Sequence, residues 1–177
     1  DMAAAYRVAA DVRARRGERG AGRKIGFTNR TIWERYGVDG PMWGEVTTGT
    51  LTPLGDVPVP LAGLCQPRLE PEVALRLARA PTADMDEAAL LECVEWFAPA
   101  FEIVHSIFPD WRFTLADCVA VNALHGRLLL GPPVAAGAWA ADLPALTLTL
   151  SRDGAVVETG RGENVLGGPL SALHHLV

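Results

Sequence analysis

Near the start of the chain, apolar residues recur with the three-to-four-residue spacing of an α-helix. A surface helix is predicted over 2–16, with Gly17 as a stop and with apolar positions at Met2, Tyr6, Ala9 and Val12. A short helix is predicted over 31–36 from a capping box and a closing glycine, namely Thr31, Glu34 and Gly37. The glycine-rich stretch 17–23 lacks the order of a phosphate-binding motif and is expected to be a flexible connection.

The clearest helical pattern covers 84–97. It combines a capping box, a proline terminator and an apolar face, which are Asp84 with Glu87, Pro99, and the set Leu90, Leu91, Val94 and Phe97. A further helix is predicted to begin after Thr114, and another over 171–177. We expect that an additional C-terminal segment follows this last helix in the complete protein.

Other segments show the period of two that is typical of β-strands. Residues 146–157 read as two strands around an Asp-Gly turn, and 40–60 read as turns with short strands. Alternation over 66–78 predicts a strand with Glu70 and Glu72 on one face.

Two carboxylates on one strand face would lie about 6 to 7 Å apart along the strand. Like charges at that distance repel, and burial would raise the pKa of at least one of them unless a cation lies between. The alternative is a solvated face on which Glu70 and Glu72 are ordinary surface charges.

A third carboxylate, Glu102, lies in a run of residues, 98–108, that is apolar on both faces and is therefore predicted to be a buried strand. A buried carboxylate must be protonated, ion-paired or bound to metal. Arg68 and Arg127 are the candidate ion-pair partners. Three carboxylates without a Cys or His cluster would suit a hard cation, Mg²⁺ or Mn²⁺, better than zinc. The metal and ion-pair interpretations both stay open at this point.

Length and charge limit the class of protein. A chain of 177 residues, about half of them apolar, is long enough for one core, so a single catalytic domain is expected over 1–177, helical over about 1–40. The net charge of −5 comes without a basic stripe, so neither nucleic acid nor membrane is expected as a partner. No apolar run approaches roughly 20 residues and no signal-peptide layout is present, so a cytoplasmic protein is predicted.

One basic residue differs from all the others. Lysine occurs once, at Lys24, while the remaining basic residues are arginines. Lysine can shift its pKa and exchange a proton, whereas arginine cannot. Lys24 is therefore a candidate for proton transfer.

The three cysteines are odd in number, widely spaced and without a C-x-x-C pair. Each has apolar neighbours in the sequence, so all three are predicted to be reduced thiols in the core: Cys65, Cys93 and Cys118.

Six segments occur in a characteristic order, namely GRKIGFT (22–28), YGVDGPMWG (36–44), QPRLEPEVAL (66–75), FEIVHSIFPDW (101–111), ADCVAVNALHG (116–126) and ENVLGGPLSAL (163–173). Together they resemble the fumarylacetoacetate hydrolase superfamily, in its branch of 2-keto-4-pentenoate hydratases and 4-oxalocrotonate decarboxylases. The E-x-E pair followed some thirty residues later by E-I-V is the most specific part of the resemblance.

The resemblance implies that Lys24 is the active-site lysine and that a divalent metal, Mg²⁺ or Mn²⁺, is bound by Glu70, Glu72 and Glu102. It also implies an α+β fold, in which mixed, mostly antiparallel β-sheets are rolled into a barrel-like core with peripheral helices. A homo-oligomer that takes part in the catabolism of aromatic compounds is expected.

The activity implied is that of a metal-dependent lyase acting on a small 2-oxo or 2-hydroxy-dienoic acid, foremost a hydratase. A 4-oxalocrotonate-type decarboxylase is the alternative, because both reactions use one metal-bound 2-oxo acid. A C–C bond hydrolase comes third, since it needs a base, for which His105 and His125 are the candidates.

A non-catalytic family member is the last alternative, because the chain departs from the family pattern. Met42 stands where hydratases often have an acidic residue, Leu124 and His125 stand where small hydroxyl residues are found, and His105 stands where Asp is common.

Overall fold

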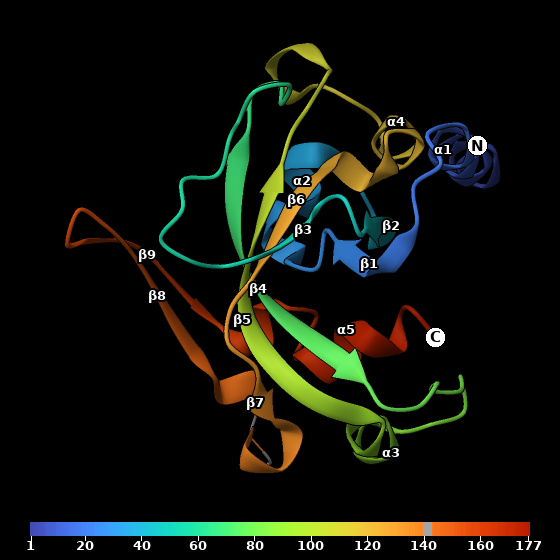
Figure 1. The fold of residues 1–177 in the computed structure, drawn as a ribbon. Helices are drawn as coiled ribbons and strands as arrows, with labels where there is room; N and C mark the ends of the chain where they lie inside the picture. Colours follow the sequence, from blue (N-terminus) through green and yellow to red (C-terminus); the bar gives the residue numbers. More distant parts are fainter. Residues whose placement is uncertain (140–142) are drawn as a thin grey trace. The chain divides into compact units, whose positions relative to one another are not determined.

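The computed structural model describes residues 1–139 and 143–177 (Figure 1). The α-helices in these residues are α1 (Met2–Arg15), α2 (Trp33–Tyr36), α3 (Glu87–Glu92), α4 (Leu115–Ala120) and α5 (Pro169–His174). The strands are β1 (Gly20–Gly26), β2 (Met42–Thr47), β3 (Leu51–Pro53), β4 (Arg68–Leu77), β5 (Val94–Val104), β6 (His125–Leu130), β7 (Val134–Ala135), β8 (Thr147–Arg152) and β9 (Ala155–Arg161).

The chain divides into two compact units. The first comprises Asp1–Phe27, Thr31–Glu72 and Ala100–Gly131. The second comprises Thr28–Arg30, Val73–Pro99 and Pro132–Val177. All six candidate site residues belong to the first unit.

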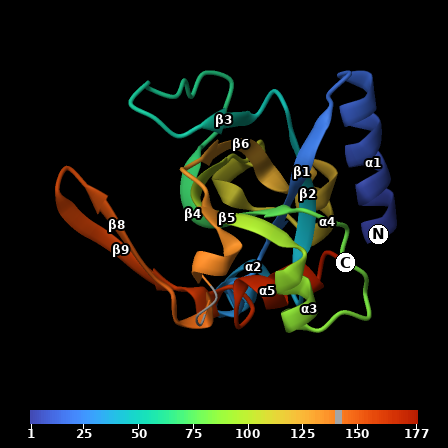
Figure 2. The ribbon, with the colours of Figure 1, turned by 60° about the horizontal axis from the view of Figure 1, so that its bottom comes forward.

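In the first unit, β1 and β2 form an antiparallel pair in which Lys24 lies opposite Gly44. Helices α1 and α4 contact each other beside this pair (Figure 2). Their apolar faces meet β2 and the end of β5 in one core cluster. The most deeply buried members of this cluster include Cys118, Val119 and Ala123. This cluster holds β2, the strand that pairs with the Lys24-bearing strand β1.

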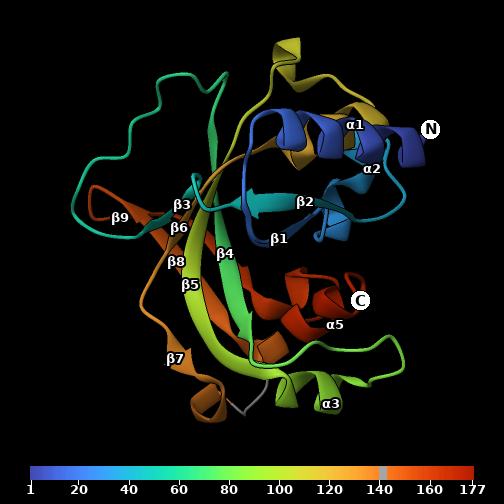
Figure 3. The ribbon, with the colours of Figure 1, turned by 45° about the vertical axis from the view of Figure 1, so that its right-hand side comes forward.

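The largest sheet has the strand order β3-β6-β5-β4, with β7 paired to β5 (Figure 3). Strand β3 runs parallel to β6, and β5 runs antiparallel to both β6 and β7. The strands described here form three separate sheets, none of which closes into a barrel. The chain therefore has a mixed α and β fold, and the barrel-like core stays a prediction.

The second unit has its own core, which buries Leu90, Phe97 and Leu173 among others. Its strands β8 and β9 form the predicted hairpin, with Asp153 (φ 52°) and Gly154 (φ 79°) in the left-handed region at the turn. A two-residue Asp-Gly turn of this kind matches the twist of the two strands.

Several predicted elements are confirmed. The first helix ends just before Gly17, which has φ 64°, and α4 begins with a complete capping box made by Thr114 and Asp117. The strand predicted over 66–78 is β4, and the final helix is α5.

The helix predicted over 84–97 is wrong in its extent. Helix α3 covers only Glu87–Glu92, its N-cap is Asp86 in place of Asp84, and β5 starts at Val94 and runs through Pro99. The apolar set predicted for one helix face does pack in one cluster, but its last two members reach that cluster from a strand. Apolar spacing over a few residues suits either element.

Four further predictions are also wrong, wholly or in part. Residues expected to be a flexible connection include β1, because they pair with β2, and the expected helical part at 1–40 is therefore interrupted by a strand. Thr31 is not the N-cap of α2, because α2 starts after a 3₁₀ turn and its N-cap is Ile32, although Gly37 closes α2 with φ 61° as predicted. Cys65 is exposed, while Cys93 and Cys118 are buried.

Across the described ranges, none of the helices combines the length and apolar character needed to cross a bilayer.

Candidate metal centre

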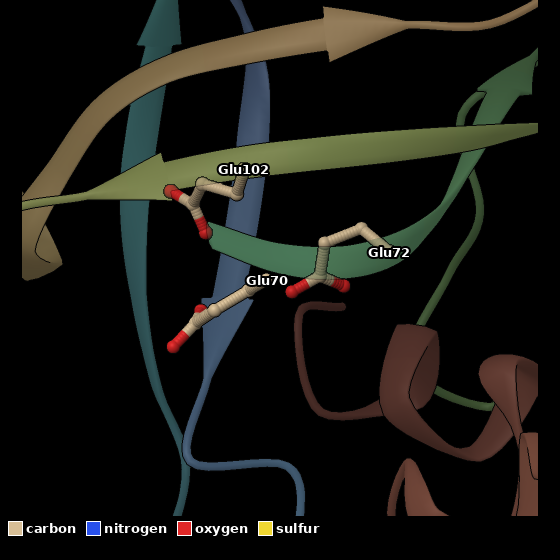
Figure 4. Close-up of side chains that lie close together, drawn as sticks. All are labelled: Glu70, Glu72 and Glu102. Atoms are coloured by element: carbon tan, nitrogen blue, oxygen red, sulfur yellow. The ribbon is translucent and has the colours of Figure 1, made fainter. Parts of the chain in front are cut away.

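Three carboxylates converge on the face shared by β4 and β5. Because side chains alternate along a strand, β4 presents Glu70 and Glu72 on the same face, and the neighbouring strand β5 supplies Glu102. One oxygen from each carboxylate lies within 4.8 Å of the others. Figure 4 shows the three carboxylates turned toward one another. The predicted convergence is therefore present in the structure.

Glu102 is buried and has two partners. Its side chain is only 2% exposed; Oε2 lies 3.0 Å from Lys24 Nζ, and Oε1 lies 2.7 Å from His125 Nδ1. The partners of this buried carboxylate are thus a lysine and a histidine, in place of the arginines considered from the sequence. Lys24 is itself 10% exposed and reaches Glu102 from β1.

His125 reaches Glu102 because the register between β5 and β6 shifts by one residue. Glu102 pairs with Leu128 and Ile103 with Arg127, but Val104 pairs with His125. Paired residues of antiparallel strands point to the same face, so this irregularity brings the side chain of His125 to the face of Glu102. Without the shift, position 125 would face the other way.

The charges around Glu102 set its protonation state. Burial opposes ionisation of this carboxyl, but Lys24 and the hydrogen bond with His125 outweigh burial and hold its pKa below the ordinary value. Burial likewise favours a neutral Lys24, yet Glu102 and the two other carboxylates raise its pKa. In the protein alone, Glu102 and Lys24 form a buried ion pair.

The two glutamates of β4 have raised pKa values. Burial, together with the charges of Glu102 and Glu70, raises the pKa of Glu72 to about 8. The pKa of Glu70 is also raised, although the residue is exposed. Partial loss of solvent around the carboxyl raises this pKa most, and the charge of Glu102 adds to the effect. The positive charges of Lys24 and Arg68 act in the opposite direction. At an effective dielectric constant of about 20, two carboxylates this close repel by roughly 3 kcal/mol, and less where one is exposed.

His105 does not join the carboxylates. It accepts a hydrogen bond from the backbone N–H of Cys65 at 3.4 Å. It is three residues from Glu102 on β5 and its continuation, which directs the two side chains to opposite faces. The prediction that His105 takes part in catalysis therefore gains no support from these contacts.

A separate recess of about 320 Å³ lies in the first unit, and none of the six candidate residues lines it. Its walls include Arg68, which lies 3.9 Å from the ring centroid of Trp111 and donates a hydrogen bond to Tyr36 Oη at 3.0 Å. Arg68 is on the same face of β4 as Glu70, so its charge favours ionised Glu70.

The family model described as fumarylacetoacetate (FAA) hydrolase C-terminal matches residues 42–177, which is most of the chain. The matched part contains β4 and β5, and with them all three carboxylates. The chain belongs to the fumarylacetoacetate hydrolase family.

Within this family, the chain is similar to hydratases and to a decarboxylase. It is 39% identical over 164 residues to a 2-keto-4-pentenoate hydratase of Burkholderia vietnamiensis (strain G4 / LMG 22486), which covers 92% of this chain and 62% of the relative. It is 34% identical over 164 residues to a 4-oxalocrotonate decarboxylase of Pseudomonas sp, which covers 91% of this chain and 61% of the relative. The chain thus spans about three fifths of the length of these relatives.

A solved structure is similar over nearly the whole chain. The 4-oxalocrotonate decarboxylase from Pseudomonas putida G7, complexed with magnesium and adipate, superposes with a TM-score of 0.88 at 28% identity, covering 99% of this chain and 68% of that chain. The similarity confirms the predicted family, and it shows that this chain shares the fold of that structure.

The structure unites five of the six residues predicted for the site and adds one that the sequence did not point to. Lys24, His125 and the carboxylates form one connected group, and the added residue is Thr50, whose hydroxyl lies 2.8 Å from His125 Nε2. Thr50 belongs to a threonine-rich turn, TTGT, that has no signature of a site. Its role depends on a contact between residues 75 positions apart, which no local pattern encodes.

Proposed function

We propose that this protein is a metal-dependent lyase that acts on a small 2-oxo or 2-hydroxy-dienoic acid, foremost as a hydratase of the 2-keto-4-pentenoate type. The observation that carries the proposal is the convergence of Glu70, Glu72 and Glu102 beside the ammonium of Lys24. The relatives with hydratase and decarboxylase names support the reaction class.

The residues fit a divalent cation. When all three carboxyls are ionised, they and the one ammonium carry two net negative charges, which a divalent cation would balance. The oxygen donors suit a hard ion such as Mg²⁺ or Mn²⁺, and the decarboxylase relative holds magnesium. We propose that Glu70, Glu72 and Glu102 are its ligands.

The metal would supply Lewis-acid stabilisation of negative charge on the oxygens of the bound 2-oxo acid. Lys24 would move a proton at C3 or C5 of the substrate, because its amine can hold and release a proton and lies beside the carboxylates proposed to bind the metal. Its neighbour Glu102 keeps the ammonium in place, since the two atoms lie 3.0 Å apart.

Decarboxylation of a 4-oxalocrotonate-type diacid is the second candidate, and the similarity to the magnesium- and adipate-bound decarboxylase supports it. A C–C bond hydrolase has less support, because both ring nitrogens of His125 are engaged within the protein, so that neither is available to activate water. A non-catalytic role is disfavoured by the retention of three mutually repelling carboxylates together with Lys24.

The remaining predictions from the sequence belong to the same proposal. We propose that the chain acts as one catalytic domain within a cytoplasmic homo-oligomer that takes part in the catabolism of aromatic compounds, and that its sheets contribute to a barrel-like core.

Steady-state turnover by the full-length protein tests the proposal. With Mg²⁺ present, 2-hydroxypenta-2,4-dienoate should be consumed, or else a 4-oxalocrotonate-type diacid if the second candidate is correct, and a chelator should abolish turnover. If neither acid is consumed with the metal present, both candidate reactions are excluded.

A further inference from the structure

His125 connects Glu102, a predicted metal ligand, to Thr50, the residue that precedes β3. Its Nδ1 lies 2.7 Å from Glu102 Oε1, and its Nε2 lies 2.8 Å from Thr50 Oγ1. The side chain of His125 is only 1% exposed. Because both ring nitrogens are engaged and the ring is buried, His125 has no free atom with which to touch a substrate.

Thr50 is itself held in place. Its hydroxyl accepts a hydrogen bond from the backbone N–H of Thr47 at 3.1 Å, and its carbonyl accepts one from the N–H of Leu128 at 2.8 Å. Leu128 is the residue opposite Glu102 in the β5–β6 pair. The imidazole is therefore fixed at one end by backbone that is attached to the same sheet as Glu102.

We propose that His125, anchored by Thr50, is a positioning residue that fixes the carboxylate of Glu102 for a divalent cation. The proposal rests on the proposed function, because it takes Glu102 to be a metal ligand. It assigns His125 a role through Glu102, in place of the direct catalytic role predicted from the sequence.

The geometry explains how the imidazole would act. A carboxylate can rotate about its last bond, but here Oε1 is held by His125, so Oε2 is left on the side of Lys24. Glu102 would then offer a single, pre-oriented oxygen to the cation. Hydrogen-bonded partners of metal ligands act in this way, and their loss typically lowers metal affinity by roughly 10- to 100-fold.

Packing alone does not account for His125. An aliphatic side chain could fill a site this buried without needing two hydrogen-bond partners, and replacing buried polar pairs by apolar residues is often neutral for stability. The register shift brings residue 125 to the face of Glu102, where its ring meets hydrogen-bond partners at both nitrogens. These contacts do fix the orientation of the Glu102 carboxylate.

Two variants of nearly equal shape separate the roles. In His125→Asn the side-chain amide can still donate to Glu102 from about the place of Nδ1, whereas His125→Leu has the same shape and no donor. We would measure the dissociation constant for Mn²⁺ by titration calorimetry without substrate, and the melting of each protein by circular dichroism. The Leu variant should bind Mn²⁺ roughly 10- to 100-fold more weakly than wild type, and the Asn variant within a few-fold of wild type.

Thr50 provides an independent test that leaves the imidazole in place. Thr50→Val removes the hydroxyl and should weaken Mn²⁺ binding, while Thr50→Ser keeps the hydroxyl and should restore it. If His125→Leu does not fold, this pair and His125→Asn still decide the question.

Equal Mn²⁺ affinity in wild type, His125→Leu and Thr50→Val would overturn the positioning role, and so would an Asn variant as weak as the Leu variant. In both cases the proposed metal site would stand, because wild type binds the ion. Absence of Mn²⁺ binding by wild type would instead overturn the proposed function and this inference together.

Discussion

Replacement of Gly44 by alanine tests how the turn in front of His125 is held. Gly44 lies on β2 opposite Lys24, and a Cβ there would lie 2.7 Å from the backbone oxygen of Asn122 and 2.8 Å from the Cβ of Ala123. Neither atom is the end of a flexible side chain, so backbone has to move. Gly44→Ala therefore pushes directly on the turn.

The turn has little freedom to adapt. Asn122, Ala123 and Leu124 have φ values of 59°, 56° and 60°, a left-handed conformation that costs non-glycine residues roughly 1 kcal/mol or more each. The side chain of Asn122 holds it against β2, since it bonds both the N–H and the carbonyl of Glu45 at 2.8 Å. His125 follows immediately, so a displaced turn displaces its imidazole.

The expected loss of stability follows from this contact. Overpacking of this kind costs about 1 to 3 kcal/mol. For a chain of this length, each kcal/mol lowers the melting temperature by about 2 to 4 °C. Gly44→Ala should therefore melt roughly 2 to 12 °C below wild type, and its affinity for Mn²⁺ should fall because Glu102 loses its fixed partner.

Thermal unfolding followed by circular dichroism provides the measurement, and Gly22→Ala is the matched control. Gly22 lies on β1, paired with Val46, and a Cβ there meets no atom within 4 Å. The control should stay within about 0.5 kcal/mol of wild type. If both alanine variants melt together and bind Mn²⁺ equally, the close contact between β2 and the turn has no energetic weight and the reasoning is refuted.

Two further predictions concern single side chains. Lys24→Arg keeps the positive charge next to Glu102, but arginine cannot release a proton. Turnover should therefore fall by roughly 10²- to 10⁴-fold, while the Mn²⁺ affinity measured by calorimetry stays within a few-fold of wild type. Undiminished turnover would exclude Lys24 as the proton carrier. A thiol reagent added to the folded protein should modify Cys65 alone, because Cys93 and Cys118 are both 0% exposed and burial raises the pKa of the Cys118 thiol to about 12. Mass spectrometry of the labelled protein identifies the modified cysteines. Rapid labelling of Cys118 would contradict the described core.

Local sequence patterns were sufficient to predict the carboxylates of the site. Alternation alone placed Glu70 and Glu72 on one face, and apolar neighbours marked Glu102 as buried. The composition marked Lys24, since it is the only lysine. Each of these signals depends on residues adjacent in the chain or on a count, so each can be obtained without coordinates.

The rest of the site depends on pairing between distant segments. The orientation of His125 follows from a one-residue register shift against β5, and its second partner, Thr50, is 75 positions away. The same limit explains the error at 84–97, where Val94 and Phe97 fit a helical period but pack from a strand. Pairing with other strands decides whether such a segment becomes a helix or a strand, and those partners lie far away in the sequence.

Divalent-ion binding to wild type and to Glu72→Gln tests the central claim most directly. Titration calorimetry with Mn²⁺ and Mg²⁺ should find one ion bound per chain in wild type, an affinity weakened by roughly an order of magnitude or more in Glu72→Gln, and no change in the control Glu87→Gln, whose residue lies on α3 outside the carboxylate group. Wild type that binds neither ion, or a Glu72→Gln protein that binds as tightly as wild type, would contradict the claim that these three carboxylates hold a single cation.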